Sequence, residues 1–139
     1  MRITNVAEIT TIVGKVQKIL PSMDKEVPFQ GEIYISNMKT GKINAWKKSE
    51  KISQNLYILQ GATWIVTAKR LNDSSFQVQC KYFEADVLQR VIIPKELYYG
   101  FLAVGLTDCR ILNILNSPYD KKTVSSLKVK EIDFSNFDP

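Results

Sequence analysis

The sequence TWIVTAKRLNDSSFQVQCKY at residues 63–82 is typical of a β-hairpin. Apolar and polar side chains alternate without interruption from Phe76 to Tyr82, as they do in a strand with one buried and one solvated face. The run 63–69 before it is rich in β-branched residues, and the polar residues 71–75 between the two runs are typical of a turn. We therefore expect two antiparallel strands joined by residues 71–75.

Similar strand patterns continue on both sides of this hairpin. Turn residues separate them, including Gly61-Ala62 and the stretch 105–108, and the one helical pattern, in residues 6–20, is weakened by Thr10-Thr11 and Gly14. Closely spaced short strands with little helix indicate a β-sandwich, jelly roll or barrel. The expected strands are 32–36, 55–60, 63–69, 76–82, 89–93, 99–104 and 109–115.

Length and composition place the chain among ordinary globular proteins. Its 139 residues are 45% hydrophobic and 24% charged, enough for one core and without the bias of a disordered chain. No apolar run reaches the roughly 18 residues of a membrane span, and the N-terminus lacks the pattern of a signal peptide. These features predict a cytoplasmic protein with no membrane association.

Charge and cysteine content exclude several classes of site. The net charge of +5 favours anionic partners, but the lysines are scattered and no basic stripe interleaved with aromatic residues predicts binding to nucleic acid. With no histidine and only Cys80 and Cys109, the usual zinc ligand sets cannot be assembled, so we expect no metal. Both cysteines are expected to be small core residues.

Three segments occur in an informative order along the chain. The first is GKINAWKK at 41–48 followed by QNLYILQG at 54–61, the second is LQRVIIPKELYYGF at 88–101, and the third is LNILNSPYD at 112–120. This order, and Ile93-Pro94 ahead of Gly100-Phe101 above all, resembles the cupin-type sugar epimerases, the family of dTDP-4-dehydrorhamnose 3,5-epimerase. The resemblance extends over about residues 30–120.

The resemblance implies an all-β, cupin-like jelly roll, that is, a double-stranded β-helix barrel. It implies a single domain over residues 1–139, with a barrel core at about 30–120, an N-terminal arm and a C-terminal tail. It also implies a homodimer that binds a small-molecule ligand such as a dTDP-sugar and needs no cofactor. In this family a histidine base removes a proton next to the sugar carbonyl, a lysine stabilises the enolate, and a tyrosine returns a proton.

The chain departs from the family where that chemistry resides. The family's Arg-Gly-x-His corresponds to Asn44-Ala45-Trp46-Lys47, its His-Gly-Phe corresponds to Tyr99-Gly100-Phe101, and Asn55 stands in place of its lysine. Its tyrosine corresponds to Tyr119. Lys47 and Tyr119 are therefore the candidate catalytic residues. A lysine ordinarily keeps its proton until about pH 10, so Lys47 is a base only if its pKa is lowered, and otherwise it is a solvated or anion-holding side chain.

Strand periodicity and amide chemistry supply the candidate ligand-binding residues. Successive strand residues face opposite ways, so only one of Lys47 and Lys48, and one of Tyr98 and Tyr99, is expected to face the cavity. Amides within an apolar strand need partners, which a ligand can supply. Trp46 and Tyr99 either contact the ligand or belong to the core. The candidates are Asn44, Trp46, Asn55, Tyr99, Asn113 and Asn116.

Three functions follow as hypotheses. The first is a divergent epimerase-like cupin that binds a sugar nucleotide or related ligand without the histidine-dependent 3,5-epimerase reaction. The second is an active keto-sugar epimerase or isomerase with a tyrosine acid and a base other than histidine. The third is a non-catalytic structural or regulatory dimer. The sequence leaves open whether the chain is an enzyme.

Overall fold

The computed structural model describes residues 1–11, 14–18, 31–117 and 120–132, which form strands and two short 3-10 helices. None of the helices in these residues has the length and apolar character needed to cross a membrane. The strands are β1 (Arg2–Asn5), β2 (Ala7–Thr11), β3 (Gly14–Lys18), β4 (Glu32–Met38), β5 (Ile43–Ser49), β6 (Gln54–Gln60), β7 (Ala62–Arg70), β8 (Phe76–Glu84), β9 (Gln89–Ile93), β10 (Tyr98–Val104), β11 (Cys109–Leu115) and β12 (Val124–Ser126). The 3-10 helices are η1 (Lys121–Thr123) and η2 (Val129–Glu131).

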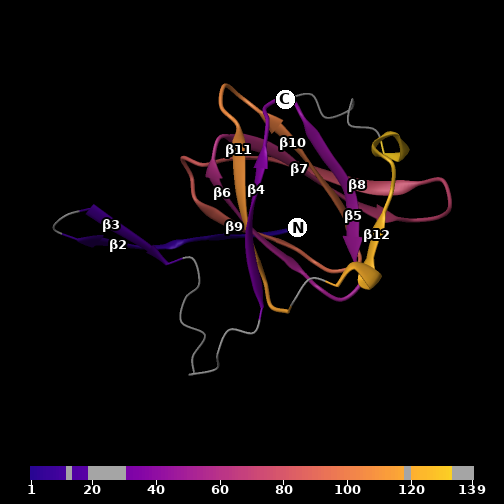
Figure 1. Cartoon of the computed structure of the whole chain (residues 1–139), viewed down its shortest axis with the longest axis horizontal. Coiled ribbons are helices and arrows are strands. Elements are labelled where there is room, and N and C mark those ends of the chain that lie inside the picture. Colours follow the sequence, from indigo (N-terminus) through magenta and orange to yellow (C-terminus); the bar gives the residue numbers. More distant parts are fainter. Residues whose placement is uncertain (12–13, 19–30, 118–119, 133–139) are drawn as a thin grey trace.

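Two five-stranded antiparallel sheets form the body of the protein (Figure 1). One has the order β1-β9-β6-β11-β4 and the other the order β12-β5-β10-β7-β8, and we name them the β4 sheet and the β5 sheet. From β4 to β11 the chain changes sheet at every connection except the β7–β8 hairpin. This alternation is the winding of a jelly roll, in which neighbouring strands are distant in sequence. The all-β prediction is confirmed, and each strand expected between residues 32 and 115 is present.

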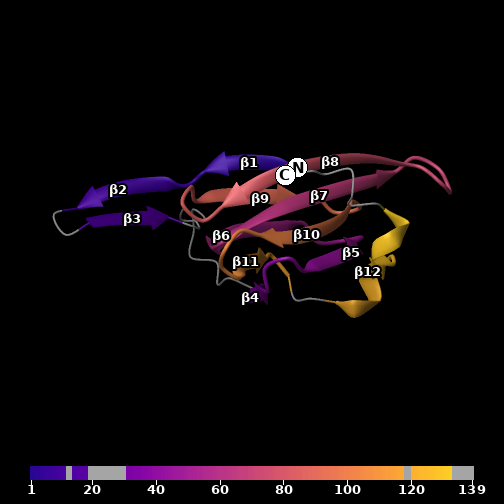
Figure 2. The ribbon, with the colours of Figure 1, turned by 90° about the horizontal axis from the view of Figure 1, so that it is seen from above.

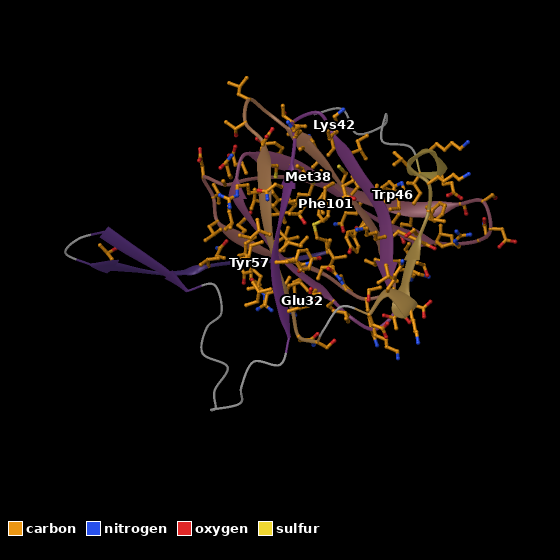
Figure 3. All side chains as sticks on the ribbon, in the orientation of Figure 1. Glu32, Met38, Lys42, Trp46, Tyr57 and Phe101 are labelled. Atoms are coloured by element: carbon orange, nitrogen blue, oxygen red, sulfur yellow. The ribbon has the colours of Figure 1, made fainter. Side chains whose placement is uncertain are left out.

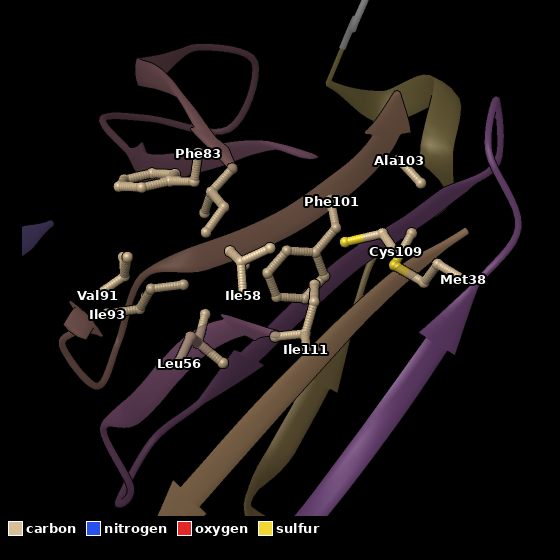
Figure 4. Packing of buried hydrophobic residues seen from close by; sticks show 11 residues of the cluster. Met38, Leu56, Ile58, Phe83, Val91, Ile93, Phe101, Ala103, Cys109 and Ile111 are labelled. Carbon is tan, nitrogen blue, oxygen red and sulfur yellow. The ribbon is translucent and has the colours of Figure 1, made fainter. Parts of the chain in front are cut away.

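The main core lies between the two sheets. Strand alternation directs Leu56 and Ile58 of β6 inward from the β4 sheet and Phe101 of β10 inward from the β5 sheet, and all three are buried. Figure 4 shows the Phe101 ring among Ile58, Ile111 and Cys109. Because side chains from both sheets interdigitate here, this contact holds the two sheets together.

The two cysteines are free thiols in different surroundings. Cys109 is fully buried in the main core, as the sequence predicts, and burial raises the pKa of its thiol to about 11. Cys80 is only half-buried and lies on the outer side of the β5 sheet, where it packs against the cluster around Trp46, and burial also raises its pKa.

The two ends of the chain contain strands that were not among those expected from the sequence. Residues 6–20, where a weak helical pattern occurs, contain instead the β2–β3 hairpin, which projects away from the sheets (Figures 1 and 2). At the other end, β12 pairs with β5 and so adds a strand to the β5 sheet. Residues 124–132 therefore pack on the β5 sheet, and Ile132 itself is buried.

The turn between β6 and β7 depends on Gly61. Its φ is +71°, and a Cβ built at this position would lie 2.7 Å from the backbone oxygen of Asp108. Gly41 has a similar φ of +78°, but a Cβ there would have no atom within 4 Å. A side chain at Gly41 would therefore meet only the strain of a positive φ. A side chain at Gly61 would meet the same strain and also a clash with the backbone of Asp108.

We predict that Gly41→Ala lowers the free energy of unfolding by about 1–2 kcal/mol, the cost of a left-handed conformation with a Cβ. Gly61→Ala should cost a further 1–3 kcal/mol, roughly, because the backbone of Asp108 must also move. Urea unfolding of both variants measures the difference. Equal destabilisation would show that the contact with Asp108 relaxes without cost.

Candidate functional site

A cavity of about 460 Å³, counted to its open mouth, lies between the two sheets beside the main core. This volume includes open solvent and the gaps between atoms, and about 70 Å³ of it is open to the centre of a water molecule. Strands of both sheets supply its walls: β4, β6 and β11 from the β4 sheet, and β5 and β10 from the β5 sheet. The lining residues are Tyr34, Ser36, Asn44, Lys47, Leu56, Tyr99, Phe101, Ile111 and Asn113.

The cavity has an apolar base and polar walls. Leu56, Phe101 and Ile111 line it and also belong to the main core, so the base of the cavity is continuous with the core. The other lining side chains end in hydroxyl, amide or ammonium groups, and no carboxylate is among the described residues that line the cavity. Such a surface can pack against the apolar face of a sugar ring and donate hydrogen bonds to its oxygens.

A β-bulge brings Asn44 and Lys47 of β5 to the same side of the sheet. Asn44 is the partner of Phe101, and Lys47 is the partner of Tyr99, so three steps along β5 match two steps along β10. In a regular strand, residues three apart point to opposite faces. The extra residue in the bulge turns the side chains of Asn44 and Lys47 to the same face of the β5 sheet, so both line the cavity.

The alternation predicted around these residues is confirmed. Lys47 lines the cavity, whereas the Nζ of Lys48 lies 5.0 Å from the centre of the Tyr98 ring on the outer side of the β5 sheet. Tyr99 lines the cavity, and its ring packs edge-on against Phe101 at a centroid distance of 5.7 Å. Tyr98 is buried in the outer cluster with Trp46.

A network of buried side chains forms one wall of the cavity. The Nδ2 of Asn113 donates to the hydroxyl of Tyr34 at 2.8 Å and to the Oε1 of Gln54 at 2.6 Å. The Oδ1 of Asn113 accepts from the backbone N–H of Asn55 at 3.1 Å. Asn113 therefore has protein partners for each of its polar atoms. Its buried amide needs no ligand to satisfy its hydrogen bonds.

Four of the residues proposed from sequence meet at this cavity: Asn44, Lys47, Tyr99 and Asn113. Asn55 does not line it, because its side-chain oxygen accepts hydrogen bonds from Arg90, one of them from Nε at 3.0 Å. Asn116 is exposed beyond the end of β11 and is outside the lining. Tyr119 lies outside the described residues.

Trp46 faces away from the cavity. It is fully buried in the outer cluster, and its Nε1 donates to the backbone oxygen of Val129 at 3.1 Å. Its backbone N–H and C=O pair with Leu127, and Figure 3 shows it on the side of β5 where the C-terminal segment runs. Trp46 thus anchors residues 124–132, which we name the C-terminal segment, on β5. This structural role accounts for the burial of the Trp46 side chain.

Tyr34, Ser36 and Gln54 belong to the site or its wall and were not identified from sequence. The alternation over residues 32–36 places Tyr34 and Ser36 on one face, which was the available signal. The third residue is Gln54, and only the hydrogen bond that its Oε1 accepts from Asn113 identifies it. No group of three metal-ligating carboxylate, thiol or imidazole side chains occurs in the part of the chain that the structure describes.

Comparison with known proteins gives structural matches without sequence matches. No family model and no curated protein sequence matches the chain. A dTDP sugar isomerase from Desulfovibrio desulfuricans G20 has a TM-score of 0.79 at 22% identity, over 96% of this chain and 88% of that one.

Two epimerase structures match in the same way. The dTDP-4-dehydrorhamnose 3,5-epimerase from Bacillus anthracis, with TDP and pyrophosphate bound, has a TM-score of 0.72 at 14% identity, over 90% of this chain and 77% of that one. A dTDP-6-deoxy-D-glucose-3,5-epimerase from Legionella pneumophila, in complex with dTDP-4-keto-L-rhamnose, has a TM-score of 0.73 at 14% identity, over 96% and 77%. At these identities the matches show the fold, and the predicted cupin-like jelly roll is confirmed.

The two tryptophans provide a matched test of the role given to Trp46. The Nε1 of Trp64 is buried without a hydrogen-bond partner among the described residues, and its ring lies 5.6 Å from that of Tyr82. We predict that Trp46→Phe lowers the free energy of unfolding by about 2–3 kcal/mol, since it leaves a cavity and an unpaired carbonyl.

Trp64→Phe removes no hydrogen bond and should cost about 1 kcal/mol or less. Urea unfolding followed by circular dichroism measures both variants. If Trp46→Phe costs no more than Trp64→Phe, the bond to Val129 does not anchor the C-terminal segment.

Proposed function

We propose that the chain binds the sugar part of a nucleotide sugar of the dTDP-sugar class in this cavity, without histidine-dependent epimerase chemistry. The observation that carries the proposal is the lining itself, which has polar walls over an apolar base and contains two phenols, two amides, a serine hydroxyl and one lysine. Proteins of this fold include ones whose names describe action on dTDP-sugars and ones crystallised with TDP or a dTDP-keto sugar.

The lack of a side chain suited to accept a proton near neutral pH is the reason to propose binding rather than catalysis. Removal of a proton next to a sugar carbonyl needs a group that accepts a proton near neutral pH, most often histidine or a carboxylate. The chain has no histidine, and no carboxylate lines the cavity among the described residues. Amides, a serine hydroxyl and an exposed lysine are suited to hold oxygen atoms of a ligand, and they favour binding over proton abstraction.

One observation favours the catalytic alternative. Lys47 is the direct cross-strand partner of Tyr99, and both line the cavity. In an active epimerase or isomerase of this kind, Lys47 would act as the base and Tyr119 as the acid. This alternative requires Lys47 to lose its proton on binding the ligand, and isotope exchange tests it directly.

We predict that the protein binds dTDP-glucose by isothermal titration, and that Lys47→Met and Tyr99→Phe each weaken binding about tenfold, the loss of one hydrogen bond worth about 1.4 kcal/mol. Asn116→Ala, which changes an exposed residue outside the cavity, serves as the control. With a dTDP-4-keto-6-deoxy sugar in heavy water, we expect binding without deuterium incorporation.

Two results would contradict this proposal. Deuterium uptake that Tyr119→Phe abolishes would establish the catalytic alternative. Absence of binding to every dTDP compound would leave the structural or regulatory role as the better explanation.

We further propose that the chain forms a homodimer. Ile33 and Ile35 of β4 are 54% and 43% exposed on the outer side of the β4 sheet, and β4 is the edge strand of that sheet. An edge strand that has no second partner among the described strands and carries exposed isoleucines is a surface that soluble proteins usually cover. The β2–β3 hairpin, which pairs with no other strand in the described residues, gives a second copy of the chain a further element to contact (Figure 1).

Light scattering after size-exclusion chromatography should give the mass of a dimer for the wild-type protein. The double variant Ile33→Glu with Ile35→Glu should shift it to the monomer, because charges on this face oppose its burial. Leu71→Glu, at the exposed end of the β7–β8 hairpin, is the control and should stay dimeric. A monomeric wild-type protein would refute the dimer.

A further inference from the structure

Lys47 carries the charge of the cavity lining. It is the one charged side chain among the described residues that line the cavity, and the others end in hydroxyl, amide or apolar groups. Its ammonium group has neither an ion pair nor a hydrogen bond within the part of the chain that the structure describes. Glu32, which shares a face of β4 with Tyr34, lies outside the lining and forms no ion pair with Lys47. The cavity therefore presents a positive charge for which the described residues supply no counter-charge.

The neighbouring Lys48 shows that other cations of this sheet have partners. Its Nζ lies 5.0 Å from the centre of the Tyr98 ring, on the outer side of the sheet. The guanidinium carbon of Arg70 lies 5.1 Å from the centre of the Phe76 ring and 5.9 Å from that of Tyr98. Aromatic faces stabilise these two cations. The fold gives Lys47 no such ring contact and directs it into the cavity instead.

The direction of Lys47 is built into its strand. The bulge of β5 lies between Asn44 and Lys47, interrupts the regular pairing with β10, and leaves both side chains on the cavity side. Bulges of this kind re-aim a side chain at the expense of regular pairing. Asn44 places an amide, which can donate a hydrogen bond, on the same face as the ammonium group. The strand thus offers two donors, one of them charged, to whatever occupies the cavity.

A ligand in this cavity must replace water around the Lys47 ammonium group. The 70 Å³ open to water centres has room for roughly five water molecules, which is comparable to one sugar ring and too small for a whole nucleotide sugar. A neutral sugar would take water from the ammonium group and return only hydroxyl or carbonyl dipoles. A carboxylate would return an opposite charge, and hydrogen bonds between ionised groups are roughly twice as strong as those between neutral ones. The lone cation therefore favours an acidic ring over a neutral one.

We infer that the sugar bound in this cavity carries a carboxylate, as hexuronic acids do, and that Lys47 pairs with it. The inference rests on the proposed function, because it names the class of sugar that the same cavity takes. Lys47 is the cross-strand partner of Tyr99, whose ring packs against Phe101 at the apolar base. This position places the ammonium group beside the sugar ring rather than beside the diphosphate, for which the cavity has no room.

The test compares dTDP-glucuronate, dTDP-glucose and TDP by isothermal titration. The wild-type protein should bind dTDP-glucuronate about tenfold more tightly than dTDP-glucose, because only the first places a carboxylate near Lys47. Lys47→Met keeps the length of the side chain and removes its charge. It should weaken binding of dTDP-glucuronate about a hundredfold and of dTDP-glucose about tenfold, so that the preference disappears, and it should leave binding of TDP unchanged.

Two further variants serve as controls. Lys47→Arg keeps the positive charge and should keep the preference for the acidic sugar. Lys48→Met removes an equal charge one residue away, on the outer side of the sheet, and should leave all three affinities unchanged. Urea unfolding of each variant confirms that it is folded.

Each outcome either supports or overturns the inference. Binding of dTDP-glucuronate without measurable binding of dTDP-glucose, lost in Lys47→Met, would support it. Equal wild-type affinities for the two sugar nucleotides would refute the acidic sugar and leave the proposed function standing. If Lys47→Met weakens TDP as much as dTDP-glucuronate, the ammonium group pairs with the diphosphate and the inference is wrong. If the wild-type protein binds none of the three probes, the proposed function and this inference both fail.

Discussion

The apolar contact between the two sheets, centred on Phe101, is the constraint on which the rest of the structure depends. The chain changes sheet at almost every connection, so strand pairing alone would not hold the sheets face to face. The cavity begins where this contact ends. On each of four strands, an apolar residue of the core is followed, two positions away on the same face, by a polar residue of the cavity or its wall. The pairs are Ile111 and Asn113, Phe101 and Tyr99, Met38 and Ser36, and Leu56 and Gln54. The site is therefore an extension of the core in which hydrogen-bonding groups take the place of methyl groups.

Lys47 and Asn44 depend on elements far from the cavity. The bulge of β5 turns both inward, and β5 lies between β10 on one side and β12 on the other. Behind the bulge, Trp46 is fixed by the backbone of Val129 and packs with the buried Ile132. Bulges change the direction of side chains at the cost of regular pairing, and here the C-terminal segment supplies contacts that compensate. The segment thereby influences which side chains the cavity presents, although none of its described residues lines the cavity.

The sequence was sufficient for most strands because their alternation is regular, and it failed where alternation breaks. β5 was not among the expected strands, although Lys47 and Lys48 were assigned the alternation of a strand, because its bulge and adjacent lysines interrupt the period of two. β12 is too short to carry a pattern. The sequence also does not determine which face of β4 points into the cavity. Its isoleucines, Ile33 and Ile35, are more apolar than Tyr34 and Ser36, yet the latter pair faces the cavity. Only the register with Asn113 decides this orientation, and register is a property of the assembled sheet. Asn113 itself was predictable, since an amide in an apolar strand needs partners, but those partners proved to be protein groups.

The chemistry of the cavity lining is the basis for proposing binding rather than catalysis. Phenols, amides and an ammonium group stabilise hydroxyl and carbonyl oxygens whether or not a reaction follows, and interactions that are equal in substrate and transition state do not raise a rate. Catalysis at carbon would need, in addition, an acceptor for the carbon-bound proton. Among the described residues that line the cavity, that acceptor would be Lys47 or a phenol, and Lys47 can accept a proton only after giving up the charge that makes it a good partner for a carbonyl or a phosphate. In one and the same step Lys47 cannot both hold an anionic oxygen as a cation and remove a proton as an amine. The proposal of binding without epimerisation therefore rests on two features of the described residues, the hydrogen-bonded Asn113–Tyr34 pair in the cavity wall and the lack of a histidine or carboxylate in the lining.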